Sequence, residues 1–198
     1  EARRARGRWW IFPPPPSRLP TRADGPLVPP AEALARFPSV PGFNTPAAPS
    51  RLPRYDYGPD FNQGLVSKHP PRPVPGQEYQ VQVPQVDADG NDVPGLRSPE
   101  ILAPVGTHTG WSLRRNGFAE GDLASLTGSF VPFPRTKAER EANGDPRLSI
   151  QERYGSHAGY LRAVARAAEG LVSESLLLEE DADRYVEAAM ARDPAGVA

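Results

Sequence analysis

The sequence contains no cysteine and no long apolar run. The absence of thiols excludes disulfides, thiol catalysis and zinc sites built on thiolates. No segment approaches the roughly 18 to 20 apolar residues that a transmembrane helix needs, so we expect no membrane span. Glycine-rich phosphate loops and His-x-x-x-His pairs are also missing, and these are common motifs of nucleotide and metal binding. We therefore predict no cofactor and no metal-binding residue.

Neither sign of charge is in excess, because 23 Lys and Arg side chains stand against 24 Asp and Glu. This balance gives no electrostatic reason to expect a nucleic-acid partner. The first residues would suit an arm that stacks on nucleic acid or lies at a membrane interface, since they include Arg3, Arg4, Arg6, Arg8, Trp9 and Trp10. However, Arg outnumbers Lys 21 to 2, so a GC-rich coding sequence with Arg as the default cation explains the same run. The start carries neither an initiator Met nor a secretory signal, and we interpret the chain as part of a longer polypeptide.

Proline divides the chain, because 22 of the 26 prolines lie in residues 1–104. Proline fixes φ and lacks an amide donor, so this half cannot be rich in helix. Large apolar residues are scattered among the prolines of residues 13–75, as in a segment that is ordered by contact with another surface. We predict a proline-rich extended wrapping segment over residues 1–76, with one short helical turn at residues 31–37.

Residues 77–135 form the second predicted region, which is small and β-rich. Tyr79, Val81 and Val83 alternate with glutamines, the period of a half-buried strand. The acidic run of residues 87–92 resembles the first positions of a calcium loop, but its glycine stands at position four instead of six. A hairpin turn explains the same residues better. We therefore expect an antiparallel hairpin or three-stranded meander around residues 78–105, with further short strands in residues 93–96 and 101–105.

The third predicted region, residues 136–198, is helical. Capping boxes at Thr136 and Ser149, each with Glu three residues later, indicate two helix starts. The helix from Ser149 should continue to about Val172, and a third helix should begin near Glu179, where acidic residues suit the helix dipole. Only about six residues join these two helices, so they should pack as an antiparallel pair. The predicted fold class is α+β. The predicted buried faces are Tyr154, Ala158, Leu161, Ala165, Ala168 and Val172, and then Leu178, Ala182, Tyr185, Val186, Ala189 and Met190.

Histidine supplies the only side chains that could act as a general base at neutral pH without a shifted pKa. The chain has three, His69, His108 and His157. His69 precedes two prolines and should be exposed. His108, Ser112 and Asp122 contain the side chains of a catalytic triad, but no spacing among them specifies one.

Residues 155–159 have the outer glycines of a Gly-x-Ser-x-Gly nucleophile elbow, but His157 stands where the serine belongs. The run also lies inside a helical pattern instead of at a strand-to-helix turn. We interpret Gly155 and Gly159 as residues that let another element approach the helix closely. The sequence therefore predicts no catalytic residue in this chain.

Several ordered strings resemble the C-terminal region of a family of bacterial proteins described as α/β-hydrolase domain-containing. They are PPPPSRLP at residues 13–20, ADG at 23–25, VPQVDADGN at 83–91, TGWSLR at 109–114, LTGSFVPF at 126–133, RTKAER at 135–140 and ERYGS at 152–156. The resemblance implies a serine-hydrolase scaffold whose nucleophile and catalytic His lie upstream of this sequence. No catalytic residue of the family then falls on any position of this chain.

From this resemblance we expect a non-catalytic portion of an esterase-like protein that packs on the catalytic domain of the same polypeptide and shapes its substrate entrance. The chain resembles part of a hydrolase family but shows no recognisable catalytic triad. The alternative is a proline-rich interaction module, because the prolines of residues 13–16 could dock in an aromatic groove of a partner protein.

Overall fold

The computed structural model describes residues 27–47, 52–115, 117–124, 128–192 and 194. The proline run of residues 13–16 and the Arg-rich start lie outside this part. The helices are α1 (Pro30–Arg36), α2 (Pro99–Leu102), α3 (Lys137–Asn143), α4 (Ile150–Tyr154), α5 (His157–Ser173) and α6 (Glu179–Met190), with a 3₁₀ helix at Phe61–Gln63. The strands are β1 (Leu27–Val28), β2 (Leu52–Asp56), β3 (Arg72–Tyr79), β4 (Val83–Pro84), β5 (Gly106–Thr109) and β6 (Ser129–Pro132).

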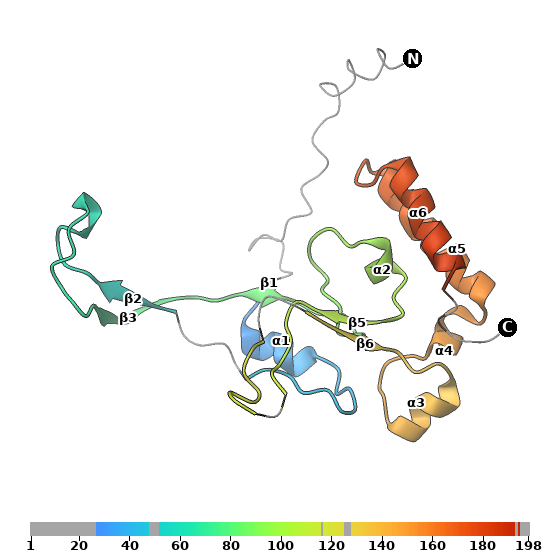
Figure 1. Cartoon of the computed structure of the whole chain (residues 1–198), viewed down its shortest axis with the longest axis horizontal. Coiled ribbons are helices and arrows are strands. Elements are labelled where there is room, and N and C mark those ends of the chain that lie inside the picture. The colour runs from blue at the N-terminus through green and yellow to red at the C-terminus, as the bar shows by residue number, and fades with distance from the viewer. Residues whose placement is uncertain (1–26, 48–51, 116, 125–127, 193, 195–198) are drawn as a thin grey trace, which may run out of the picture.

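The described strands form three antiparallel pairs, which are β1 with β4, β2 with β3, and β5 with β6. In the last pair, Gly106 lies opposite Pro132 and Thr109 lies opposite Ser129. Figure 1 shows this pair in the middle of the body, between α1 and the C-terminal helices. The predicted α+β class with small antiparallel sheets is confirmed.

The predicted placement of the strands around residues 78–105 is wrong in three places. Residues 93–96 form no strand. The alternating residues from Tyr79 onward do not form a long strand, because β3 ends at Tyr79 and β4 holds only two residues. Ile101 lies in a helix instead of a strand. Pro99 occupies the first turn of that helix, where its fixed φ is favourable, and the Ser98 carbonyl accepts the amide of Ile101 (2.9 Å). The strand predicted there lies further along the chain, in β5.

Both predicted capping residues begin helices. The Thr136 hydroxyl accepts the amide of Glu139 (3.1 Å) at the start of α3, although the Glu139 carboxylate bonds to the Arg135 amide (2.8 Å) and so does not complete the box. Ser149 and Glu152 form a complete capping box at the start of α4. The short helical turn predicted at residues 31–37 is also confirmed, as α1.

The single long helix predicted over residues 149–172 is wrong, because the structure divides it into α4 and α5. Gly155 follows α4 with a φ of +70°, which favours glycine. The Ser156 hydroxyl then accepts the amide of Gly159 (3.2 Å) and caps a new helix. A β-carbon at Gly159 would lie 1.9 Å from the carbonyl oxygen of Tyr154. Gly159 therefore does permit a close approach, and the element that approaches is the preceding helix.

Helices α5 and α6 lie side by side (Figure 1). They run antiparallel, because the His157 ring at the start of α5 lies 3.1 Å from the Ala189 carbonyl near the end of α6. The predicted helical pair is thus confirmed. None of the helices in the described residues has the length and apolar character that crossing a bilayer requires.

The core lies where these helices meet α4 and the segments around β5 and β6. Its buried members are Ala103, Val105, Phe133, Ile150, Tyr160, Val164 and Ala189. In α5 the buried residues are Tyr160, Val164, Ala168 and Leu171. Of the predicted face, Ala168 is buried and Tyr154 and Leu161 pack partly buried against the core, but the centre of the buried face is displaced by about one residue. In α6 the predicted face was too wide, since Leu178 and Met190 are 62% and 61% exposed.

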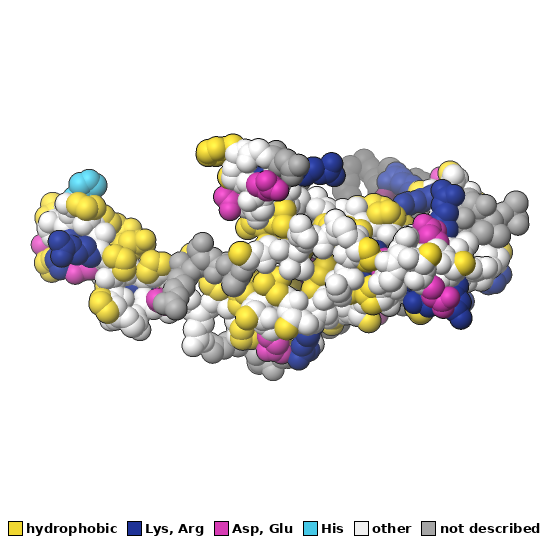
Figure 2. All heavy atoms as spheres, turned by 90° about the horizontal axis from the view of Figure 1, so that it is seen from below, with side chains coloured by type: hydrophobic (Ala, Val, Ile, Leu, Met, Phe, Trp, Pro, Cys, Tyr) yellow, Lys and Arg dark blue, Asp and Glu magenta, His cyan; other side chains and the backbone are white. Residues whose placement is uncertain are grey.

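Residues 52–79 form a hairpin that projects from the body (Figure 1), which we call the β2–β3 arm. Its register places Leu52 opposite Tyr79 and Asp56 opposite Arg72, with an irregularity between the two ends. Figure 2 shows the arm as a lobe that stands apart from the rest of the molecule.

Candidate functional site

Residues 155–159, the run that resembles a nucleophile elbow, connect two helices. The Ser156 hydroxyl is occupied as the cap of α5. A ring nitrogen of His157 contacts the Ala189 carbonyl, and the ring stacks on Tyr160 with centroids 6.5 Å apart. The Ser156 hydroxyl and the His157 ring, the two groups here that could take part in catalysis, therefore hold α5 in place and join it to α6.

His108, Ser112 and Asp122 lie on β5 and the loop that follows it. The His108 ring packs beside Phe130 of β6 with centroids 4.8 Å apart, and burial lowers the pKa of the imidazole. The Ser112 hydroxyl donates to the carbonyl of Ala124 (3.2 Å), which ties the two ends of the loop together. Asp122 is exposed. The His108 ring therefore packs on the sheet, and the Ser112 hydroxyl holds the loop together.

The acidic run forms the predicted hairpin turn, and residues 86–92 are closed by an antiparallel bridge. One carboxylate oxygen of Asp87 accepts the amides of Asp89 and Asn91, both at 3.0 Å. The other oxygen pairs with Arg97 at 2.7 Å. The Asp87 carboxylate is therefore committed to the turn.

A buried polar hub that the sequence did not reveal attaches this turn to β5. Asn91 and Thr107 are both fully buried. The Asn91 side chain donates to the carbonyl of Gly106 (3.3 Å) and accepts the amide of His108 (2.8 Å). It thus makes the backbone hydrogen bonds that a neighbouring strand would otherwise make with β5. The Thr107 hydroxyl donates to the carbonyl of Asp89. The turn is thereby fixed on the edge of β5.

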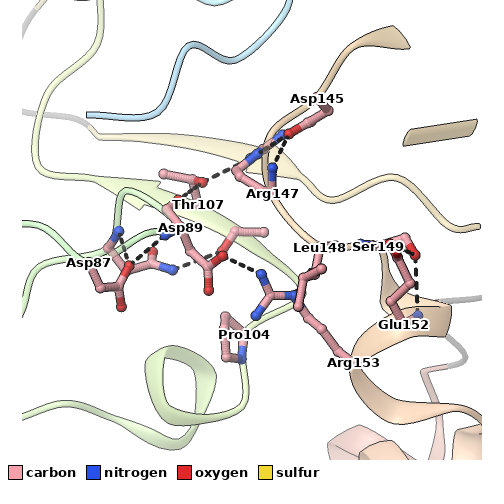
Figure 3. Close-up of polar contacts among 12 residues, drawn as sticks. Asp87, Asp89, Pro104, Thr107, Asp145, Arg147, Leu148, Ser149, Glu152 and Arg153 are labelled. Carbon is pink, nitrogen blue, oxygen red and sulfur yellow. Dashed lines mark hydrogen bonds and ion pairs between the residues drawn. The ribbon is translucent and has the colours of Figure 1, made fainter. Parts of the chain in front are cut away.

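Arg147 extends the hub to β6 (Figure 3). Its side chain is 1% exposed and pairs with Asp145, which is 5% exposed, at 2.6 Å. The guanidinium also donates to the Thr107 hydroxyl (2.8 Å) and to the carbonyls of Val131 (3.0 Å) and Pro132 (3.2 Å). Burial alone would raise the pKa of Asp145, but the hydrogen bonds from Arg147 outweigh it and the pKa is lowered. The Asp145 carboxylate therefore stays charged inside the body.

Arg153 of α4 completes the hub. It forms an ion pair with Asp89 (Figure 3), and its guanidinium lies 4.2 Å from the ring centroid of Phe133, within the range of a cation–π contact. Because the hub joins the turn, β5, β6 and α4, it makes one rigid unit of segments that are far apart in the sequence. Its only sequence signal is indirect, since Asp89 and Arg153 both belong to the strings that resemble the hydrolase family.

The β2–β3 arm carries many exposed apolar side chains. The exposed fractions of its large apolar residues range from 45% to 62%, for Leu52, Tyr55, Phe61, Leu65, Val66 and Tyr79. The tip is stabilised by an ion pair between Lys68 and Asp56 and by stacking of Tyr57 on Phe61 with centroids 4.6 Å apart. His69 is exposed near this tip, as predicted.

No group of three or more His, Cys, Asp or Glu side chains in the described residues could hold a metal ion.

The family model of the alpha/beta hydrolase domain matches residues 44–187, which is well over half of the chain. The chain belongs to this family. The sequence resemblance is thereby confirmed for the family. The match includes the β2–β3 arm, the buried polar hub and helix α5. No curated protein and no solved structure matches the chain.

Proposed function

We propose that this alpha/beta hydrolase family chain is the non-catalytic part of a longer esterase-like protein and packs on the catalytic domain of the same polypeptide. The observation that carries the proposal is the apolar surface of the β2–β3 arm. Contiguous apolar surface of this kind marks interaction sites in proteins. An isolated two-stranded hairpin is also marginally stable in water, so the arm gains stability from a second surface.

The surroundings of the candidate side chains support the non-catalytic half of the proposal. The nucleophile of an alpha/beta hydrolase stands on a sharp turn between a strand and a helix. Residues 155–159 instead connect two helices, and Ser156 and His157 serve packing. Every strand pair in the described residues is antiparallel, whereas a hydrolase sheet with crossover helices is mostly parallel.

The proposed role in shaping the substrate entrance follows from the combination of a rigid body and a projecting arm. The hub fixes the body through Asn91 and Arg147, and the arm extends from that body (Figure 1). When the chain is docked on the catalytic domain, the arm would lie along the surface of that domain beside the body. It would thereby limit which substrates enter the active site.

An ester hydrolysis assay tests the non-catalytic reading. The chain alone should give no turnover of short-chain p-nitrophenyl esters above the buffer rate. His108→Ala and His157→Ala variants are compared with His69→Ala, which changes an exposed imidazole on the arm. Robust turnover that disappears in either of the first two variants, but not in the third, would overturn the proposal.

Docking is tested by the accessibility of the arm tip. In a polypeptide that also carries the catalytic domain, Lys68 should be protected from trypsin, and Leu65→Ser should reduce this protection. Leu178→Ser is the matched control, because Leu178 is 62% exposed on α6 and Leu65 is 58% exposed on the arm. Equal cleavage at Lys68 with and without the catalytic domain would contradict docking through the arm.

A further inference from the structure

A pocket with mostly apolar walls lies on the body between α1, β4 and the segment after β5. Its volume is about 350 Å³, within the range of about 300 to 1,000 Å³ that small-molecule sites occupy. Ala33 and Leu34 of α1 form one wall, and Val83 and Leu123 contribute to the others. Figure 2 looks onto the side of the body that carries α1 and shows hydrophobic side chains gathered near its middle.

Two aromatic rings form part of this pocket. The rings of Phe37 and Trp111 line it, with centroids 5.8 Å apart and planes at 55°. Phe43 supports Trp111 from behind with a centroid distance of 5.4 Å. Gly90 is required beside them, because a β-carbon there would lie 2.9 Å from the Phe37 ring and the φ is +81°. The pocket wall is therefore built by specific packing.

Asp92 is the single charged residue among those that line the pocket. Within the described part of the chain, its carboxylate makes no hydrogen bond or ion pair, whereas the nearby carboxylate of Asp87 is held by Arg97. The Asp92 side chain is exposed to solvent at the pocket, and partial desolvation together with the negative charge of Asp87 raises the pKa of its carboxyl. A cation bound in the pocket would lie near this unpaired carboxylate.

We propose that the pocket binds a small organic cation with an apolar body. The faces of aromatic rings attract ammonium groups, and quaternary ammonium ligands are recognised in this way. Trp111 and Phe37 supply aromatic rings in the wall, Asp92 supplies the opposite charge, and the aliphatic walls accommodate the apolar body. The inference does not depend on the proposed function, since it concerns binding by this chain alone.

The test uses three probes that share an aromatic body and differ in charge. They are benzyltrimethylammonium, its neutral carbon isostere neopentylbenzene, and phenylacetate. Binding is followed by the fluorescence of Trp111 in the full chain with Trp9→Phe and Trp10→Phe. The cation should bind most tightly and the anion most weakly.

Asp92→Asn should weaken binding of the cation about two- to fivefold, as for an exposed ion pair, and leave the neutral probe unchanged. Asp183→Asn makes an equal change of charge on the exposed side of α6. It should leave the binding of the cation and of the neutral probe unchanged. Trp111→Leu, measured by calorimetry, should reduce the preference for the cation while circular dichroism shows a folded chain. The proposal is overturned if no probe binds at millimolar concentration, or if the cation and its neutral isostere bind equally before and after Asp92→Asn.

Discussion

Replacement of Arg147 by Met tests whether the buried polar hub holds the body together. The change leaves the Asp145 carboxylate charged and 5% exposed without its partner. It also removes the donor from the carbonyls of Val131 and Pro132. Met fills most of the same volume, so the effect is one of charge and hydrogen bonding and not of a cavity.

The magnitude follows from the burial of the pair. Breaking a buried ion pair by removing one partner costs about 3–5 kcal/mol, and domains of this size are stable by about 5–15 kcal/mol. Arg147→Met should therefore lose much of the free energy of unfolding. Adding Asp145→Asn removes the uncompensated charge, so the double variant should recover about 2–3 kcal/mol of that loss.

Urea denaturation followed by circular dichroism measures both effects. Arg184→Met is the control, because Arg184 is 71% exposed in its pair with Asp181, and exposed pairs contribute about 0–1 kcal/mol. Should Arg147→Met prove too unstable to fold, Arg147→Lys keeps the charge and is compared instead. Equal unfolding midpoints for the Arg147 and Arg184 variants would refute the reasoning.

Three further predictions concern other parts of the chain. A hydrogen bond from Arg140 is the main cause that lowers the pKa of Glu152 to about 2 from an ordinary 4.5. Because the pKa of Glu152 is lower in the folded than in the unfolded chain, its carboxylate stabilises the fold above about pH 4.5, and this stabilisation is lost as the pH falls towards 2. The melting temperature of Glu152→Gln should therefore fall less over this pH range than that of the unmodified chain. In α5, Gly159→Ala should lower the urea midpoint, because the added β-carbon would lie 1.9 Å from a carbonyl oxygen. Gly170→Ala places its β-carbon in open space and should raise the free energy of unfolding by up to about 1 kcal/mol. The reverse order of the two variants would contradict the close packing of α4 on α5. Trypsin should cut the chain alone after Lys68, whose side chain is 54% exposed near the tip of the β2–β3 arm. Persistence of the same fragment in Lys68→Gln would show that the arm tip is not the cleaved site.

The helix starts could be predicted from the sequence because their causes are local. Thr136 and Ser149 each bond to an amide three residues later, and that relation is visible in a short string. The break between α4 and α5 is just as local, since a glycine with positive φ is followed by the cap residue Ser156. It was missed because the apolar spacing on both sides suggested one continuous helix.

The strands were predicted less well because their partners are distant. β3 pairs with β2 although Pro73 and Pro75 lie within it, and proline normally argues against a strand. Two-stranded pairs tolerate proline because each strand has an open edge. The sequence shows the prolines but not which edge faces solvent, so the arm could not be predicted.

The hub was invisible for the same reason, since Arg153 meets Asp89 across 64 residues and Arg147 meets Thr107 across 40. Yet Asp89 and Arg153 lie in strings that resemble the hydrolase family. In this chain both side chains serve a structural contact, because their ion pair holds the turn against α4. Family membership therefore indicates a shared fold of this body before it indicates any shared chemistry. Under the proposed function, the chemistry would depend on the catalytic domain on which this body and its apolar arm pack.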